Sequence, residues 1–143
     1  DLMTKSYTVT LPANTFGTAF FISMKFAAKK TTGGTTSQFR HYIKWSTTDY
    51  ASATQLAYYI SPLITNTSTF MESTFNVESG KLRTNRSSTV SLAGEAPTIT
   101  LPEEFVFNPA IDNIFYVVLQ RNGSTSTDTF GINSLDVRIT KKP

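Results

Sequence analysis

The stretch Phe39–Trp45 reads FRHYIKW, and its residues alternate with a period of two. Its odd-numbered positions are apolar or aromatic apart from one histidine, whereas the positions between them are Arg40, Tyr42 and Lys44. Because successive side chains of a β-strand point to opposite faces of the sheet, this pattern predicts a strand with one apolar and one polar face. The stretch Phe20–Phe26, FFISMKF, predicts a second strand of the same kind.

Strand-like segments recur along the chain at the short intervals expected of a β protein. Further segments occupy residues 7–11, 56–60, 70–77, 90–92, 99–101, 105–107, 114–119 and 135–139. Only Asp49–Tyr59 is compatible with a short helix. About eight to ten strands of this length are typical of an antiparallel β-sandwich with a jelly-roll-like topology. We therefore expect residues 1–143 to form a single all-β sandwich domain.

Composition narrows the range of functions. The 143-residue chain has 16% charged residues, a net charge of +3 and no cysteine. Without cysteine the chain has no disulfide, zinc–thiolate centre or thiol nucleophile. The basic residues are dispersed rather than gathered in a stripe, and no segment approaches the roughly 20 apolar residues of a membrane helix. We therefore expect neither nucleic-acid binding nor insertion into a membrane.

Residue types that serve catalysis or bind metals are few. His41 is the only histidine, and it shares the predicted apolar face of its strand with Ile43 and Trp45. We interpret it as a partly buried, hydrogen-bonded imidazole rather than as a catalytic base. Glu103 and Glu104 are neighbours, so in a strand they point to opposite faces, and we interpret them as surface charges after a proline turn. The sequence predicts a protein without enzymatic activity, cofactor or metal.

A group of aromatic and charged residues lies on and directly after the predicted strand 39–45. Aromatic faces stack on sugar rings while neighbouring charged groups bond the hydroxyls, and tyrosines offer rigid, amphipathic contact area. The candidate glycan-binding residues are Arg40, Tyr42, Lys44, Trp45, Asp49, Tyr50 and Tyr59. The alternative, that these rings lie in the core or at an interface between protomers, stays open.

The end of the chain, Phe115–Ile139, reads FYVVLQRNGSTSTDTFGINSLDVRI. It resembles the C-terminal strand pair of jelly-roll domains at the tips of phage tail fibres and tailspikes. In that pattern an aromatic-rich strand with an arginine leads to a polar loop with Asp-Thr and then to a strand of Leu-x-Val-x-Ile type. The matching positions are Tyr116, Val118, Arg121, Asp128, Thr129, Leu135, Val137 and Ile139. The rest of the chain shares only the rhythm of strands.

The resemblance implies a non-catalytic domain at the tip of a homotrimeric phage appendage. Such a domain is made in the host cytoplasm and acts outside the cell, as part of the virion, by binding a polysaccharide or other glycan of the host surface. The alternatives are a trimerisation or folding cap of the fibre without a ligand, and a carbohydrate-binding module of a glycoside hydrolase. Because the sequence starts at Asp1 rather than at Met, we expect a C-terminal fragment of a longer protein.

The run Ile114–Leu119 is apolar at every position except Tyr116, so the predicted strand is apolar on both faces. One face is expected to pack inside the sandwich. The other face either meets a neighbouring protomer, as a homotrimer requires, or is covered within the same sandwich.

Overall fold

The computed structural model describes residues 4–32, 38–60, 68–90, 104–122 and 129–143. In these residues it contains nine strands and no helix. The strands are β1 (Thr4–Leu11), β2 (Phe20–Thr32), β3 (Gln38–Ser46), β4 (Thr54–Ile60), β5 (Ser68–Glu78), β6 (Lys81–Val90), β7 (Glu104–Val106), β8 (Asn113–Asn122) and β9 (Thr129–Lys141). A turn at residues 50–53 leads directly into β4, so the short helix considered for Asp49–Tyr59 is wrong.

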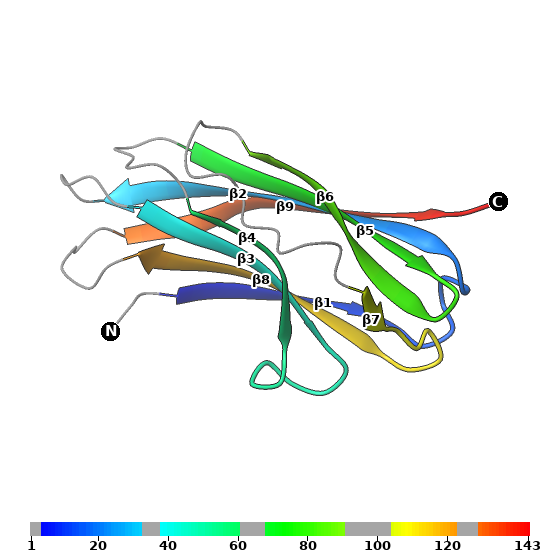
Figure 1. The fold of residues 1–143 in the computed structure, drawn as a ribbon. Coiled ribbons are helices and arrows are strands. Elements are labelled where there is room, and N and C mark those ends of the chain that lie inside the picture. Colours follow the sequence, from blue (N-terminus) through cyan, green and yellow to red (C-terminus); the bar gives the residue numbers. More distant parts are fainter. Residues whose placement is uncertain (1–3, 33–37, 61–67, 91–103, 123–128) are drawn as a thin grey trace.

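The strands form two antiparallel sheets that pack face to face (Figure 1). Sheet A has four strands in the order β1-β8-β3-β4, and sheet B has five in the order β7-β6-β5-β2-β9. Since β1, β3 and β8 lie in one sheet and β2 and β9 in the other, the chain crosses repeatedly between the sheets. Such crossings are typical of jelly-roll-like sandwiches. The predicted all-β, antiparallel sandwich is confirmed.

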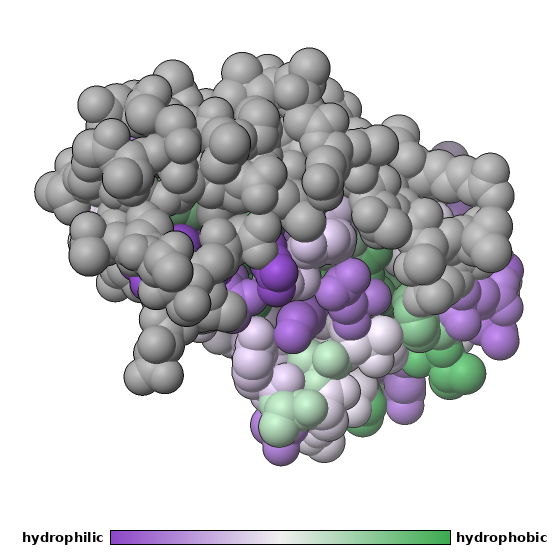
Figure 2. All heavy atoms as spheres, turned by 60° about the vertical axis from the view of Figure 1, so that its left-hand side comes forward, coloured by the Kyte–Doolittle hydropathy of each residue, from purple (hydrophilic) through white to green (hydrophobic). Residues whose placement is uncertain are grey.

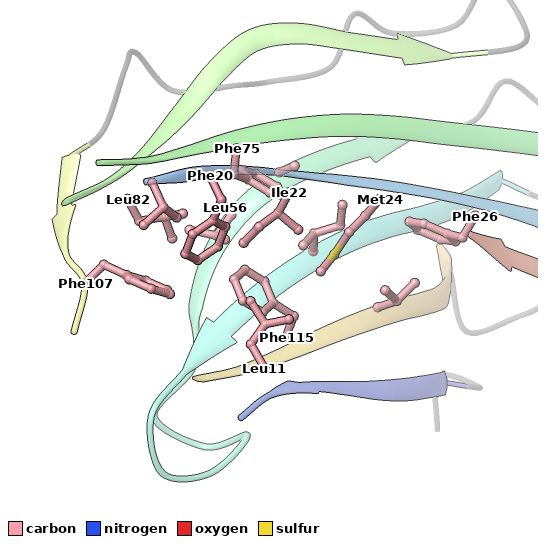
Figure 3. Close-up of a cluster of buried hydrophobic side chains, with 14 of the residues drawn as sticks. Leu11, Phe20, Ile22, Met24, Phe26, Leu56, Phe75, Leu82, Phe107 and Phe115 are labelled. Carbon is pink, nitrogen blue, oxygen red and sulfur yellow. The ribbon is translucent and has the colours of Figure 1, made fainter. Parts of the chain in front are cut away.

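The inner faces of the two sheets share one hydrophobic core (Figure 3). On β2, the alternate side chains Phe20, Ile22, Met24 and Phe26 are at most 2% exposed. Across the core, the rings of Phe75 on β5 and Phe115 on β8 stack with their centroids 6.4 Å apart. Burial of each such side chain contributes about 1.5–3 kcal/mol to stability. The alternation visible in the sequence therefore decides which face of each strand joins the sheets together.

A tight hairpin joins β5 to β6. Glu78 pairs with Lys81, and the two residues between them, Ser79 and Gly80, have positive φ angles of 53° and 71°. Two left-handed residues are the signature of a type I′ turn, whose twist matches that of the flanking strands. The sequence indicated this turn but not the strand that follows it, because Lys81–Val90 is rich in polar residues. Of the predicted strands, 99–101 and most of 90–92 lie outside the described residues.

The last two strands, which the resemblance treats as a pair, lie in different sheets. β8 is a central strand of sheet A, between β1 and β3. β9 runs along the edge of sheet B beside β2, with a register shift between Ala27 and Ala28. Each strand therefore belongs to a different sheet.

Among the described residues no further strand pairs with the outer edge of β1 or of β9, and we call the side of the sandwich between these two edges the open side. The contacts between β4 and β6 place those strands at the opposite side. Tyr7 pairs with the core residue Val117 and so belongs to the inner face of β1, yet it is 50% exposed. On β9, the inward-facing Leu135 and Val137 are only partly buried. Apolar groups that face inward thus remain accessible along this side.

Candidate functional site

The outer face of sheet A brings tyrosines and a lysine from three strands together. In the central row, Tyr42 of β3 lies opposite Val118 of β8 on one side and Tyr58 of β4 on the other. In the next row, Lys44 lies opposite Tyr116. Directly opposed side chains of antiparallel strands approach within about 4.5–5.5 Å at Cβ. The side chains on this face are therefore direct neighbours rather than isolated aromatic residues.

Two pairs of tyrosine rings are in contact on this face. Tyr42 and Tyr58 stack with their ring centroids 5.0 Å apart and their planes inclined by 28°. Tyr50, from the loop between β3 and β4, meets Tyr116 edge to face at 5.2 Å and 82°. Both arrangements are favourable for aromatic pairs and hold the rings in defined orientations.

Lys44 links the two ring pairs. Its Nζ atom lies 4.8 Å from the centroid of the Tyr50 ring and 5.5 Å from that of the Tyr42 ring. Both distances are within the range of cation–π attraction. The side chain is half-buried and makes no ion pair within the described part of the chain. The ammonium group is therefore held by aromatic faces instead of by a carboxylate.

These groups surround a depression of about 410 Å³ in the outer face of sheet A. Its lining residues are Tyr42, Lys44, Tyr50, Gln55, Val118 and Gln120. The lining combines ring faces, a cation and two amides, which can both donate and accept hydrogen bonds. A concave surface that combines aromatic faces with polar groups suits a small ligand or one unit of a polymer.

Asp49 shapes the loop that carries Tyr50. Its Oδ1 accepts hydrogen bonds from the backbone N–H of Ser52 at 2.9 Å and from the Ser52 hydroxyl at 2.8 Å. These bonds, the backbone one first, hold the pKa of the Asp49 carboxyl below its ordinary value. The hydroxyls of Ser46, Thr48 and Ser52 lie 2.7–3.3 Å from one another. The carboxylate is thus engaged within the loop and does not line the depression.

Arg40 lies on the same outer face, next to the depression. It pairs across the sheet with Gln120 of β8, whose side chain lines the depression. The Arg40 Nε atom is buried and has no hydrogen-bond partner among the described residues. Arg40, Tyr42 and Lys44 therefore share the outer face of β3, and Tyr50 reaches the same face from the following loop.

Trp45 does not join this group. Trp45 points to the inner face, packs against the ring of Phe107 with centroids 5.9 Å apart, and donates from Nε1 to Asn113 Oδ1 at 3.1 Å. It therefore supports the core and the loop before β8, as the period of two requires of an odd-numbered position. Tyr59 pairs through its backbone with His41, and its side chain lies outside the described part.

His41 is fully buried, more deeply than the sequence suggested. It is 0% exposed, and its ring centroid lies 5.4 Å from that of Phe26 on the opposite sheet. Among the described residues no group of three or more histidines, cysteines and carboxylates is placed to hold a metal ion.

The sequence analysis did not find half of the lining. Gln55, Val118 and Gln120 join the lining through cross-strand pairing, which a single sequence does not show. A register shift in β4, between its pairings with Ile43 and Lys44, adds to this difficulty because it breaks the alternation just before Tyr58. The signal in the sequence is that Tyr58 and Tyr59 are consecutive, because neighbouring residues of a strand point to opposite faces.

The apolar run Ile114–Leu119 is covered on both faces by this chain. Phe115, Val117 and Leu119 belong to the core side and are 0% exposed. On the outer face Val118 is 1% exposed beneath the depression, and Tyr116 is 9% exposed against the ring of Tyr50. Coverage within the same sandwich thus accounts for the second apolar face of β8, one of the two alternatives left open.

Comparisons with known proteins give no relative. No protein family matches this sequence, and neither the curated proteins nor the solved structures contain a significant match. In the described residues there is no helix with the length and apolar character needed to cross a membrane. Figure 2 shows strongly hydrophilic residues interleaved with pale and hydrophobic ones over the part of the surface that is coloured.

Proposed function

We propose that this protein is a non-catalytic carbohydrate-binding domain that holds a cell-surface glycan in the depression on the outer face of sheet A. The observation that carries the proposal is the arrangement of Tyr42, Lys44 and Tyr50 around one concavity. The rings of these tyrosines are fixed by contacts with Tyr58 and Tyr116, so little side-chain entropy is lost when a ligand binds.

The chemistry of the depression matches that of a sugar. A pyranose presents C–H groups on its faces and hydroxyls around its edge, so it binds best to a surface that offers an aromatic face beside hydrogen-bonding groups. Tyr42 and Tyr50 offer the aromatic surface, and Gln55, Gln120 and Lys44 offer the polar groups. The hydroxyls of Ser6 and Thr8 on the adjoining edge strand extend the polar surface, since both are exposed.

The resemblance of Phe115–Ile139 to phage fibre tips supports a more specific assignment. We propose that the domain is the distal, receptor-binding part of a tail fibre or tailspike and that it acts outside the host cell. The jelly-roll-like sandwich is compatible with this assignment. Because folds host many functions, the assignment depends on the site and on the resemblance more than on the fold itself.

Binding to cells and polysaccharides tests the proposal. We expect the isolated domain to bind at least one purified bacterial surface polysaccharide and the cells that carry it. Replacing Tyr42 or Tyr50 with alanine should weaken binding about tenfold or more, because each ring contributes about 1 kcal/mol beyond its buried area. Phe21→Ala is the matched control, since Phe21 is a 36% exposed ring on the outer face of sheet B. Unchanged affinity in both tyrosine variants, or no binding to any cell or polysaccharide, would refute the proposal.

A second candidate function is assembly of a homotrimer without a ligand, and the open side of the sandwich favours it. The half-exposed, inward-facing Tyr7 on β1 and the partly buried Leu135 and Val137 on β9 present apolar surface between two strand edges. Unpaired strand edges form hydrogen bonds with other strands, and closed homo-oligomers are built from such repeated contacts. A second copy of the chain is therefore the expected partner on this side.

Sedimentation separates this candidate from the first. If the open side is an interface, the domain sediments as a trimer at micromolar concentration and Tyr7→Glu converts it to a folded monomer. A stable monomer in the unmodified protein would contradict assembly through this domain. Glycan binding by that monomer would support the first candidate alone.

A further inference from the structure

The outer face of sheet A carries two cations and no acid among its described residues. The described positions of β1, β3, β4 and β8 that share this face include Arg40 and Lys44 and no Asp or Glu. Neither Arg40 nor Lys44 makes an ion pair with a residue that the structure describes. The acid nearest to Lys44 along the chain is Asp49, whose Oδ1 accepts hydrogen bonds from Ser52.

Several cations elsewhere in the described residues are paired. Lys81 and Arg83 both contact Glu104, at 3.2 and 2.8 Å. Arg138 lies 2.9 Å from Asp136, and Lys142 lies 2.8 Å from Glu78. Unlike these four cations, Arg40 and Lys44 have no carboxylate partner among the described residues, and Lys44 lies against two tyrosine rings instead.

We propose that the ligand of the depression is an acidic glycan, a saccharide that bears a carboxylate or phosphate group. This inference rests on the proposed function, since it names the class of glycan bound at the same site. A half-buried ammonium group with no counter-ion attracts an anion more strongly than a fully solvated one does, because less solvent screens the interaction. The acidic group of the ligand lies against Lys44 while its sugar ring contacts Tyr42 or Tyr50.

Arg40 supplies a second contact for an acidic polymer. Its guanidinium group is suited to carboxylates and phosphates, which it binds through two parallel hydrogen bonds. On β3 it lies two residues from Tyr42 and four from Lys44 on the same face, so the two cations flank the Tyr42 ring along the strand. Strand residues rise about 3.3 Å each, so Arg40 and Lys44 are separated by about 13 Å along β3, a distance that suits successive units of a polysaccharide rather than one isolated anion.

Matched pairs of polysaccharides test the inference. We would take a panel of purified bacterial capsular polysaccharides and lipopolysaccharides. Affinity is measured for each polymer as isolated, after reduction of its carboxyl groups to alcohols, and after removal of its phosphates. We expect one of the two treatments to weaken binding about tenfold or more, and the treatment that does so identifies the acidic group. Raising the salt concentration from about 0.1 M to about 1 M should weaken binding of the acidic form and leave the neutral form little changed.

Variants of one residue connect the effect to the site. Lys44→Gln should bind the acidic and the neutralised polymer with similar affinity, whereas Lys44→Arg should retain most of the preference for the acidic form. Lys29→Gln is the control, because Lys29 is exposed and lies on β2 in the other sheet. Its variant should keep the full preference.

The outcomes separate this inference from the function on which it rests. Equal binding of the native and neutralised polymers would overturn the acidic ligand and leave carbohydrate binding intact. A preference for the acidic form that persists in Lys44→Gln would overturn the role of this site. Failure to bind any polymer, acidic or neutral, would remove both proposals together.

Discussion

The outer faces of the two sheets are built from the same alternation but differ in how their charges are arranged. On sheet B, a depression of about 230 Å³ is lined by Ser23, Lys25, Glu72, Asp136 and Arg138. Acids and bases adjoin one another there, and Arg138 is paired with Asp136. On sheet A, the depression contains rings and an ammonium group without an acid. A face whose charged groups pair with one another is suited to contact with water. A face with aromatic rings and with cations that have no acidic partner among the described residues is suited to binding a ligand.

Substitution in the core that supports both outer faces should have the largest effect on the free energy of unfolding. Phe75 is 1% exposed and stacks against Phe115 of the opposite sheet. We expect Phe75→Ala to lower the free energy of unfolding by about 3–5 kcal/mol, through lost burial and the cavity that remains. Urea denaturation followed by tryptophan fluorescence measures it, and a loss below about 1 kcal/mol would show that the two sheets do not depend on this contact.

Exchanging valine and threonine distinguishes the outer faces of the two sheets, and the expected effect on stability is smaller than that of Phe75→Ala. Val118 on sheet A is 1% exposed although it faces outward. We expect Val118→Thr to cost about 1–3 kcal/mol of stability, because its hydroxyl has to be buried. The reverse exchange on sheet B, Thr140→Val, affects an exposed position and should stay within about 0.5 kcal/mol. If both variants have equal stability in urea denaturation, Val118 is not covered in solution.

The sequence is sufficient to predict the β-sandwich, but not all the residues that line the depression on sheet A. Alternation over Phe20–Phe26 and Phe39–Trp45 determines which side chains enter the core, because it depends only on local geometry. It also placed Arg40, Tyr42 and Lys44 on one outer face. The partners on β8 and β4 depend on register, which results from contacts between distant segments and a shift in β4. Trp45 is among the candidate glycan-binding residues because it is close to them in sequence, although its odd-numbered position places its side chain on the inner face.

The carboxyl groups of the two sheets should differ in their response to salt. Lys142 holds the pKa of Glu78 below its ordinary value, and Arg83, with Lys81, does the same for Glu104. The pKa of Asp49, in the loop between β3 and β4, is lowered by hydrogen bonds from the uncharged Ser52. In an NMR titration at about 1 M salt, we expect the two glutamate pKa values to rise toward their ordinary range and the Asp49 pKa to stay low. An equal response of the three groups would contradict these assignments.

The same three carboxyl groups give stability a common dependence on pH. Since each pKa is lower in the folded protein than in the unfolded chain, the stabilisation is fully present above the ordinary pKa, near pH 4. It is lost as the pH falls through the lowered values. Thermal unfolding from pH 7 down to about pH 2 should show a decline that begins near pH 4, and Asp49→Asn should make that decline shallower. A melting temperature that is constant over this range would rule the contribution out.

The most direct test of the account is to locate the ligand by NMR. A saturating bacterial polysaccharide fragment, chosen as the tightest binder of the domain, is added while the aromatic ring resonances are followed. The account predicts saturable shifts for Tyr42, Tyr50 and Tyr116 on sheet A, with the resonances of Phe21 on sheet B unchanged. Saturable shifts confined to sheet B, or to Tyr7 on the open side, would contradict the assignment of the outer face of sheet A as the binding surface.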